Sequence, residues 1–257
     1  MNLPTTAIVC LSACLPGWFA SLGAGTVRFA NYDWTVKSGT GGPGPNLWDE
    51  RNVWVDEQGY LHLRISRLDD RWSCAEVVLQ QRLGFGAYEF EVSGRIDRLD
   101  DNVVLGLFNY PPADVGPDAT HEIDIEFARW GRAENPAGNF VVWPAQTGLR
   151  QQAKTFAFTL DHELTLHRFI WSPTQVRFGS WRGQAARPSE ELGSWTFSPP
   201  DPAASISTQP MPVHLNLWLF QGRPPTNGQE VEMVIRAFRF TPPPLPPTGL
   251  RIVVQSD

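Results

Sequence analysis

Cysteine, long apolar runs and excess positive charge are all scarce in this sequence of 257 residues. Its three cysteines, Cys10, Cys14 and Cys74, lack zinc-ligand spacing beside histidines, which argues against a structural zinc site. We expect Cys74 to be a buried free thiol. No segment beyond the N-terminus approaches the roughly 18 apolar residues of a membrane span. The formal net charge of −6 argues against nucleic acid or an anionic membrane as the main partner.

Helical periodicity is also missing, because no long segment repeats apolar residues at i, i+3, i+4 and i+7. The chain instead contains 22 Gly, 23 Pro, 11 Trp and 15 Phe, spread among short alternating runs. This pattern predicts an antiparallel all-β protein with many turns, built as a sandwich or jelly roll. The expected strands, separated by Gly or Pro turns, cover residues 60–66, 87–92, 103–108, 121–127, 138–143, 167–172, 175–181, 212–219 and 231–240.

These strands predict one domain over residues 26–241, flanked by two segments of different composition. Residues 1–25 contain an apolar stretch and end in small residues, which predicts a secretory signal. The letters L-S-A-C also resemble a bacterial lipoprotein box in which Cys14 is lipidated, and a short buried segment is the remaining interpretation. We therefore expect a secreted or extracytoplasmic protein, lipid-anchored in the second case. Residues 242–257 form a proline-rich tail that we expect to be stiff.

The stretch H-E-I-D-I-E-F at residues 121–127 carries a carboxylate at every second position. Glu122, Asp124 and Glu126 follow the period of a β-strand, so their side chains point to one face. At about 3.3 Å per residue the outer two Cα atoms lie about 13 Å apart, and inward-leaning side chains bring the carboxyl groups within about 5–6 Å. Retaining glycosidases use about 5–5.5 Å and inverting ones about 6.5–9.5 Å, so the spacing favours retention.

Two full charges about 5.5 Å apart repel by about 3 kcal/mol at an effective dielectric constant of about 20. This repulsion equals about two pKa units and keeps one glutamate protonated near neutral pH. A retaining mechanism needs one ionised nucleophile and one protonated acid, and a row of acids can supply both. Asp124, which is shorter and lies between the glutamates, can hydrogen-bond a neighbour and hold its proton. The alternatives are a solvated strand face, which most such triplets form, and a calcium site, which a flat strand face disfavours because it lacks looped oxygen ligands.

Tryptophans near this stretch favour sugar binding. Trp130 and Trp143 follow it closely, and aromatic faces stack on the C–H faces of sugars. In H-L-N-L-W, Asn216 and Trp218 share one face of an expected strand, and His214 shares that face too. We expect His214 to be an exposed or already hydrogen-bonded histidine, and most of the other tryptophans to belong to the core.

With these motifs the sequence resembles glycoside hydrolase family 16, the retaining endo-β-glucanases and their transglycosylase relatives. E-I-D-I-E-F resembles the central motif of the family in its form without a β-bulge. Further matching stretches fall in the order that the family has: N-L-W-D-E-R-N-V-W-V-D-E-Q-G-Y-L-H-L, C-A-E, G-F-G-A-Y-E-F-E-V, L-H-R-F-I-W-S-P-T-Q-V-R-F and H-L-N-L-W. The resemblance covers most of residues 28–241. It implies a concanavalin-like jelly-roll sandwich of two curved antiparallel sheets, with the acidic strand on the concave side.

The resemblance also implies roles for single residues. Glu122 would be the nucleophile, Asp124 its electrostatic helper and Glu126 the general acid/base. The expected substrate-binding residues are Asn52, Glu76, Trp130, Trp143, Asn216 and Trp218. No cofactor is required, although some members bind a structural calcium ion, for which this sequence assigns no ligands. The expected partner is a polysaccharide, and the chain is expected to be a monomer.

Departures from the family pattern bear on specificity. Lichenases continue C-A-E with Tyr-Arg-Ser, whereas Val77, Val78 and Leu79 follow here, so the substrate-binding arginine is missing. Cys74 has no partner for the lichenase disulfide. Arg129 either shapes a different sugar subsite or is a surface charge. The sequence thus predicts a retaining endo-acting glycoside hydrolase that cleaves a β-glucan. The alternatives are a glucan transglycosylase and a non-catalytic lectin, which would not need the acid pair.

Overall fold

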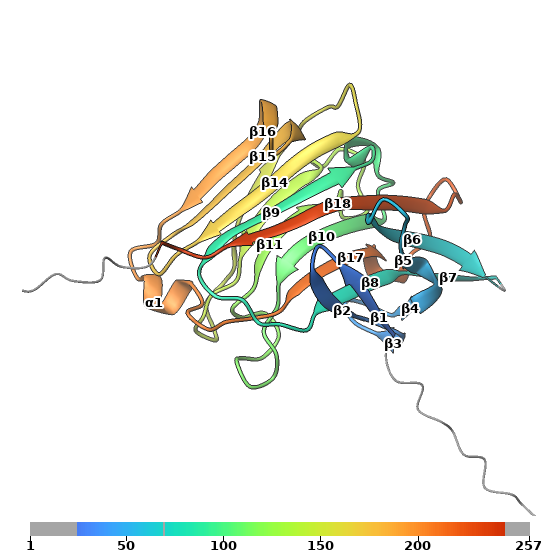
Figure 1. Ribbon diagram of the computed structural model, residues 1–257. Coiled ribbons are helices and arrows are strands. Elements are labelled where there is room, and N and C mark those ends of the chain that lie inside the picture. The colour runs from blue at the N-terminus through green and yellow to red at the C-terminus, as the bar shows by residue number, and fades with distance from the viewer. Residues whose placement is uncertain (1–24, 69, 245–257) are drawn as a thin grey trace, which may run out of the picture.

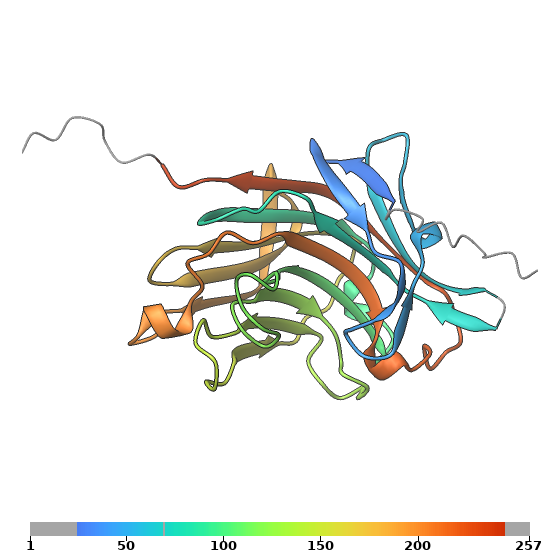
Figure 2. The ribbon, with the colours of Figure 1, turned by 90° about the horizontal axis from the view of Figure 1, so that it is seen from below.

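The computed structural model describes residues 25–68 and 70–244 of the chain. The expected leader up to residue 24, with Cys14, and the tail from residue 245 onward lie outside the described residues. Two large antiparallel sheets lie one over the other as a sandwich (Figures 1 and 2). The predicted all-β jelly-roll fold is therefore confirmed.

The first sheet carries the acidic stretch near its middle. Its spatial order is β1 (Thr26–Phe29), β2 (Tyr32–Val36), β8 (Ala75–Leu79), β17 (Val213–Leu219), β10 (Val103–Asn109), β11 (Ile123–Phe127), β12 (Gly138–Val142) and β13 (Gln152–Phe156). Every neighbouring pair in this order is antiparallel. Strands from both halves of the sequence therefore meet beside β11.

The second sheet packs behind the first. Its order is β16 (Arg187–Phe197), β15 (Val176–Gln184), β14 (Leu164–Trp171), β9 (Gly86–Ser93), β18 (Val231–Thr241), β6 (Leu61–Leu68) and β5 (Val53–Val55), with β7 (Arg71–Ser73) paired to β6. The smaller elements are the hairpin of β3 (Gly39–Gly41) and β4 (Asn46–Trp48), the helix α1 (Pro202–Ser205), and the 3₁₀ turns η1 (Glu50–Asn52), η2 (Ile96–Arg98) and η3 (Phe220–Gly222).

The expected strands are present, with boundaries that differ by a few residues. The expected ranges omit the strands before β6, the strands β7 and β8, and also β13 and β16. The last two lie at a sheet edge, and β13, with the sequence Q-A-K-T-F, is exposed over most of its length. An edge strand needs no apolar face to be buried, so its sequence lacks the alternation that reveals an inner strand.

The core fills the space between the sheets. Ile123, Ile125 and Phe127 of β11 are fully buried in it, which leaves the alternate positions of that strand on the opposite face. Cys74 is a buried free thiol, as predicted, and burial raises its pKa to about 12. In the described residues no helix is long and apolar enough to cross a membrane.

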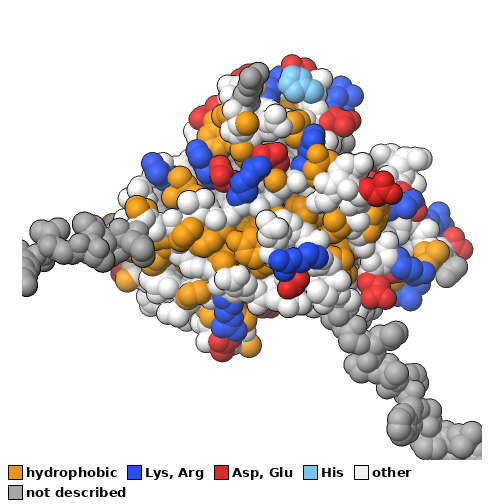
Figure 3. Space-filling view, in the orientation of Figure 1, with side chains coloured by type: hydrophobic (Ala, Val, Ile, Leu, Met, Phe, Trp, Pro, Cys, Tyr) orange, Lys and Arg blue, Asp and Glu red, His pale blue; other side chains and the backbone are white. Residues whose placement is uncertain are grey.

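The outer face of the second sheet is a solvated surface. Basic and acidic side chains are scattered over the side of the molecule seen in Figure 3. Some of them pair across neighbouring strands, as Arg168 does with Glu89 and Arg239 with Glu91. The acidic row of Glu122, Asp124 and Glu126 lies on the other sheet, at β11.

Candidate active site

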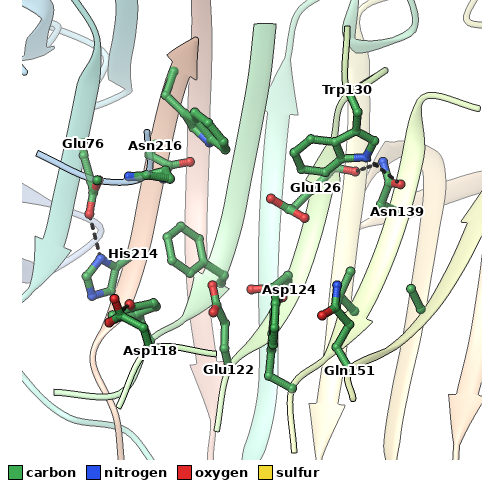
Figure 4. A pocket seen from close by; sticks show the side chains of 18 of the residues that line it. Glu76, Asp118, Glu122, Asp124, Glu126, Trp130, Asn139, Gln151, His214 and Asn216 are labelled. Atoms are coloured by element: carbon green, nitrogen blue, oxygen red, sulfur yellow. Dashed lines mark hydrogen bonds and ion pairs between the residues drawn. The ribbon is translucent and has the colours of Figure 1, made fainter. Parts of the chain in front are cut away.

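A pocket of about 760 Å³ lies on the face of the first sheet that points away from the core. Its lining side chains come from β8, β17, β10, β11, β12 and β13, and from the loops beside them (Figure 4). The lining residues are Lys37, Gly42, Pro43, Glu76, Phe108, Tyr110, Asp118, Glu122, Asp124, Glu126, Trp130, Asn139, Val141, Trp143, Gln151, Ala153, His214, Asn216 and Trp218.

Strand register aligns one row of polar residues across this face. Glu126 on β11 lies opposite Gly106 on one side and Asn139 on the other. Gly106 in turn pairs with Asn216 on β17, and Asn216 pairs with Glu76 on β8. Residues separated by more than a hundred positions in sequence are therefore neighbours across the floor of the pocket.

The three carboxylates of β11 and the residue before it share the pocket face, as their spacing predicted. Asp124 is buried, whereas Glu122 and Glu126 are partly exposed to the pocket. Figure 4 shows all three on the pocket side of the sheet, with Asp124 between its neighbours. The side chains of Asp124 and Glu122 are joined by a hydrogen bond, and Trp143 Nε1 donates to Asp124 Oδ2 at 3.1 Å.

Burial of these acids raises all three pKa values. Burial, with repulsion from Glu122, raises the pKa of Glu126 to about 8. Burial also raises the pKa of Glu122 to about 7, although its hydrogen bond with Asp124 opposes the rise. The pKa of Asp124 lies well above its ordinary value because of burial and of both neighbouring glutamates. The rise at Asp124, which is the most deeply buried of the three, favours Asp124 as the donor in its hydrogen bond with Glu122.

Two tryptophans lie close to each other on the wall of the pocket. Trp130 has a positive φ of 55°, and its indole Nε1 donates to Asn139 Oδ1 at 3.2 Å. Its ring centroid lies 6.4 Å from that of Trp218, which is largely packed against its neighbours. The left-handed turn at Trp130 places its ring over Glu126 (Figure 4). Both tryptophans, with Trp143, line the pocket, where sequence reasoning expected them.

Asn52 does not line the pocket, contrary to the role that the resemblance implied. It is buried in η1, where its Nδ2 donates to Ser73 Oγ at 2.9 Å and its Oδ1 accepts from Ser66 Oγ at 2.7 Å. Its amide is therefore used to join η1 to β6 and β7. The error has a simple cause, because the motif around Asn52 shows which residues are present and not which way the amide points.

Arg129 holds a loop in place and does not line the pocket. Its guanidinium donates to the carbonyl oxygens of Ala133, Asn135 and Asp97, at 3.1, 2.7 and 3.1 Å. These bonds hold the turn after β11 against η2. The sequence left two interpretations open for Arg129, a residue that shapes a sugar subsite or a surface charge. Neither describes this arginine, because its guanidinium is used in bonds to the backbone.

Several pocket residues were not predicted. His214 was expected to be exposed or hydrogen-bonded, and it is hydrogen-bonded to Glu76 but also lines the pocket. Lys37 follows β2 directly and forms an ion pair of 2.7 Å with Glu76. On the loop before β11, Asp118 accepts a hydrogen bond of 2.5 Å from Tyr110. His214 is two positions from Asn216 on the same strand, so the sequence could have placed both on the pocket face. Lys37 and Asp118 belong to no motif, so nothing in the sequence indicated their position.

The described residues contain no group of three or more His, Cys, Asp or Glu side chains that could hold a metal ion. The structural calcium that the resemblance implied therefore has no such ligand set here.

Comparison of the sequence with models of known protein families gives no match, and comparison with curated protein sequences gives none either. Comparison of the structure with solved structures does give matches. A lichenase, or β-1,3-1,4-glucanase, from a mouse hindgut metagenome is 19% identical with a TM-score of 0.62, over 84% of this chain and 98% of that one.

Two further solved structures are similar to this chain. A family 16 endo-glucanase from Bacteroides ovatus is 16% identical with a TM-score of 0.60, over 81% of this chain and 94% of that one. An immunostimulatory antigen and pseudo β-1,3-glucanase of Mycobacterium tuberculosis is 19% identical with a TM-score of 0.60, over 82% and 91%. At these identities the likeness establishes the fold. Since that fold includes a protein named as a pseudo-glucanase, the activity has to be argued from the site.

Proposed function

We propose that this chain is a member of glycoside hydrolase family 16 and a retaining, endo-acting enzyme that cleaves internal β-linkages of a polysaccharide, a β-glucan in the first place. One observation carries the proposal. Three carboxylates stand in a row on the floor of the pocket, with the pKa of Glu126 at about 8 and that of Glu122 at about 7. Both pKa values lie near neutral pH, so one glutamate of the row can hold a proton while the other is charged, which is the arrangement that double displacement needs.

In the first step the Glu122 carboxylate attacks the anomeric carbon of the sugar. The bond from that carbon to the leaving oxygen breaks as Glu126 donates its proton to that oxygen, and a glycosyl ester forms on Glu122. In the second step Glu126 takes a proton from water, whose oxygen attacks the same carbon and releases Glu122. Two inversions give net retention of configuration. Throughout, the proton of Asp124 orients Glu122, and Trp143 holds Asp124 in place.

The position of the acids within the pocket supports cleavage inside a chain. Glu76, His214 and Asn216 line the pocket on β8 and β17 to one side of β11, and Gln151 and Ala153 line it on the other side. The pocket therefore extends to both sides of the bond to be cleaved, and a polysaccharide that crosses these strands contacts the protein on both sides. Aromatic rings at Trp130, Trp143 and Trp218 supply faces for sugar stacking.

The location of the protein remains part of this proposal. The pattern of residues 1–25 supports export, either through a cleaved signal or with Cys14 lipidated. The mass of the mature chain from producing cells separates these two forms, because lipidation adds acyl groups to a chain that then begins at Cys14. Size-exclusion chromatography tests the expected monomer.

The test is a panel of mixed-linkage, β-1,3- and xyloglucan polysaccharides, with assay of new reducing ends and NMR of the first anomer released. We expect oligosaccharide products with retained configuration. Glu122→Gln and Glu126→Gln should each lower kcat by about 10²–10⁴-fold with an unchanged circular dichroism spectrum. Glu134→Gln, at an exposed glutamate that does not line the pocket, is the matched control and should keep full activity.

Full activity in either pocket variant on a confirmed substrate would overturn the assignment of the acids. Added acceptor oligosaccharide distinguishes the transglycosylase, which would extend the acceptor with little hydrolysis. Binding of glucan without any product after long incubation would instead identify a lectin.

A further inference from the structure

A connected group of three side chains lies at the β8 end of the pocket and takes no part in the proposed chemistry. Lys37 Nζ lies 2.7 Å from Glu76 Oε2, and Glu76 Oε1 lies 2.9 Å from His214 Nδ1. All three residues line the pocket, and Figure 4 shows Glu76 and His214 joined beside Asn216. The group therefore offers a fixed polar surface at some distance from the reacting bond.

Lys37 fixes one end of this group. Besides Glu76, its ammonium donates to the carbonyl oxygen of Gly42 at 2.7 Å and lies 4.1 Å from the centre of the Trp48 ring. The Glu76 side chain is only 4% exposed. Burial opposes its ionisation, but the hydrogen bonds and charges of His214 and Lys37 hold the pKa of Glu76 below its ordinary value. Glu76 is thus an ionised carboxylate with both oxygens engaged.

This carboxylate fixes the hydrogen bond at one nitrogen of His214. An ionised carboxylate can only accept, so Nδ1 is the donor, and Nε2 is left for a second hydrogen-bond partner. In the described part of the chain Nε2 has no hydrogen-bond partner. The ring is held by Phe108 and Tyr110, at 5.1 and 5.6 Å between centroids, so it cannot turn freely.

Strand register locates His214 relative to the reaction. His214 on β17 pairs with Phe108 on β10, and Phe108 pairs with Asp124 on β11. Two strand spacings of about 4.8 Å separate His214 from the row of acids. A polysaccharide lying across the strands therefore reaches His214 with a sugar beyond the one that Glu122 attacks.

We propose that His214 is a substrate-binding residue whose Nε2 forms a hydrogen bond with a hydroxyl group of that more distant sugar. Glu76 and Lys37 are positioning residues that hold the ring in place. This inference rests on the proposed function and specifies how the same cleft holds an uncharged sugar chain. No bond is made or broken at this group.

Binding is tested in the Glu122→Gln variant, which should bind substrate without cleaving it. The ligand is a β-glucan tetrasaccharide with the linkage that the unaltered chain cleaves, and Kd is measured by calorimetric titration. In this background His214→Phe keeps a ring against Phe108 and Tyr110 but removes both nitrogens. We expect its Kd to rise about tenfold, the effect of losing one hydrogen bond in a desolvated site. Glu76→Gln should raise Kd by a smaller factor, since the amide oxygen still accepts from Nδ1.

His62 supplies the matched control. It is also paired with carboxylates, at 3.0 Å from Asp56 and 2.8 Å from Glu232, but it lies on the second sheet and does not line the pocket. His62→Gln should leave Kd unchanged. In the otherwise unaltered chain, His214→Phe should raise KM for a chromogenic tetrasaccharide about tenfold with kcat within about twofold, and leave the disaccharide analogue unaffected.

An unchanged Kd in His214→Phe overturns the inference and leaves the proposed function intact. An equal loss on the long and the short substrate also overturns it, because a structural defect at the cleft would affect both. Failure of the Glu122→Gln chain and of the unaltered chain to bind any β-glucan overturns the proposed function together with this inference.

Discussion

At the scale of single residues, Asp124 determines how protons are shared in the acidic row. Three carboxylates in a buried row cannot all ionise, and Asp124 is the most deeply buried of them. Its side chain is hydrogen-bonded to Glu122, while Trp143 Nε1 donates to Asp124 Oδ2. Among the described residues Glu126 has no such hydrogen-bond partner, and its pKa is raised to about 8. One aspartate thus gives two chemically identical neighbours different hydrogen bonding.

These protonation states predict a bell-shaped pH dependence of kcat/KM. Glu122 must be ionised, so activity falls as the pH drops below about 7, and Glu126 must be protonated, so activity falls as the pH rises above about 8. The two limbs belong to the coupled row as a whole. The measurement is kcat/KM for a soluble glucan from pH 4 to pH 10.

One exposed residue offers a check on the acidic limb. Burial is the largest cause of the raised pKa of Glu122, and the negative charges of Asp118 and Glu76 raise it further. Asp118→Asn should therefore move the acidic limb to lower pH. Asp114→Asn, at a neighbouring loop aspartate paired with Arg82, should not move it. An optimum that is the same in all three proteins and lies near pH 4 would contradict the assignment.

The same pKa values bear on stability. Because the pKa values of Glu122 and Glu126 are raised above 4.5, the folded chain binds more protons than the unfolded chain. Their contribution to folding is therefore fully present below about pH 4.5 and is lost as the pH rises through about 7 and 8.

At the scale of elements, β10 separates the acidic strand from the Asn216 strand and carries a glycine between them. A Cβ at Gly106 would collide with Asn216 Oδ1 and press on the Phe108 ring. The absence of a side chain lets the Asn216 amide lie over β10. Asn216 Oδ1 is buried and has no hydrogen-bond partner in the described residues, which suits an acceptor reserved for a substrate hydroxyl.

Gly106→Ala should therefore displace the Asn216 amide and raise KM for glucan by about tenfold, with a folded chain. Gly84→Ala is the control, because a Cβ there would lie 3.7 Å from Pro210, an ordinary contact outside the pocket. Steady-state kinetics of both variants, with melting curves, checks the expectation. Equal KM values in the two variants would show that the space above Gly106 is not used.

Elements differ in how well their sequences predicted them. Inner strands such as β10 and β17 have one face in the core and were expected from alternation alone. The edge strands β13 and β16 bury little and were missed. The acidic stretch was placed on a strand correctly, because Ile123, Ile125 and Phe127 are buried in the core and alternate with the acids. This alternation predicts a strand independently of the function of the acidic face.

At the scale of the whole molecule, aromatic side chains join the two sheets beneath the pocket. Phe140 of β12 stacks on Phe156 of β13, with centroids 4.6 Å apart, and on Phe178 of β15 in the second sheet, at 5.0 Å. Its neighbours along β12, Asn139 and Val141, point the other way and line the pocket. The core thus supports the strand that forms one side of the site.

Phe140→Ala should lower the free energy of unfolding by about 3–5 kcal/mol, through lost burial and the cavity left behind. Leu149→Ala, at a side chain that is 49% exposed, should change it by about 0.5 kcal/mol or less. Urea unfolding followed by tryptophan fluorescence measures both. A similar loss in the two variants would argue against a shared aromatic core as the support of the site.

By itself the sequence determined the fold class, most of the inner strands and the common face of Glu122, Asp124 and Glu126. These features follow from a period of two along one segment, and that information is local. Only the tertiary structure decided that Lys37 and His214 meet at Glu76 and that Asn52 points away from the pocket. Such contacts depend on the register between strands distant in sequence, which the core and loops set together and no single segment records.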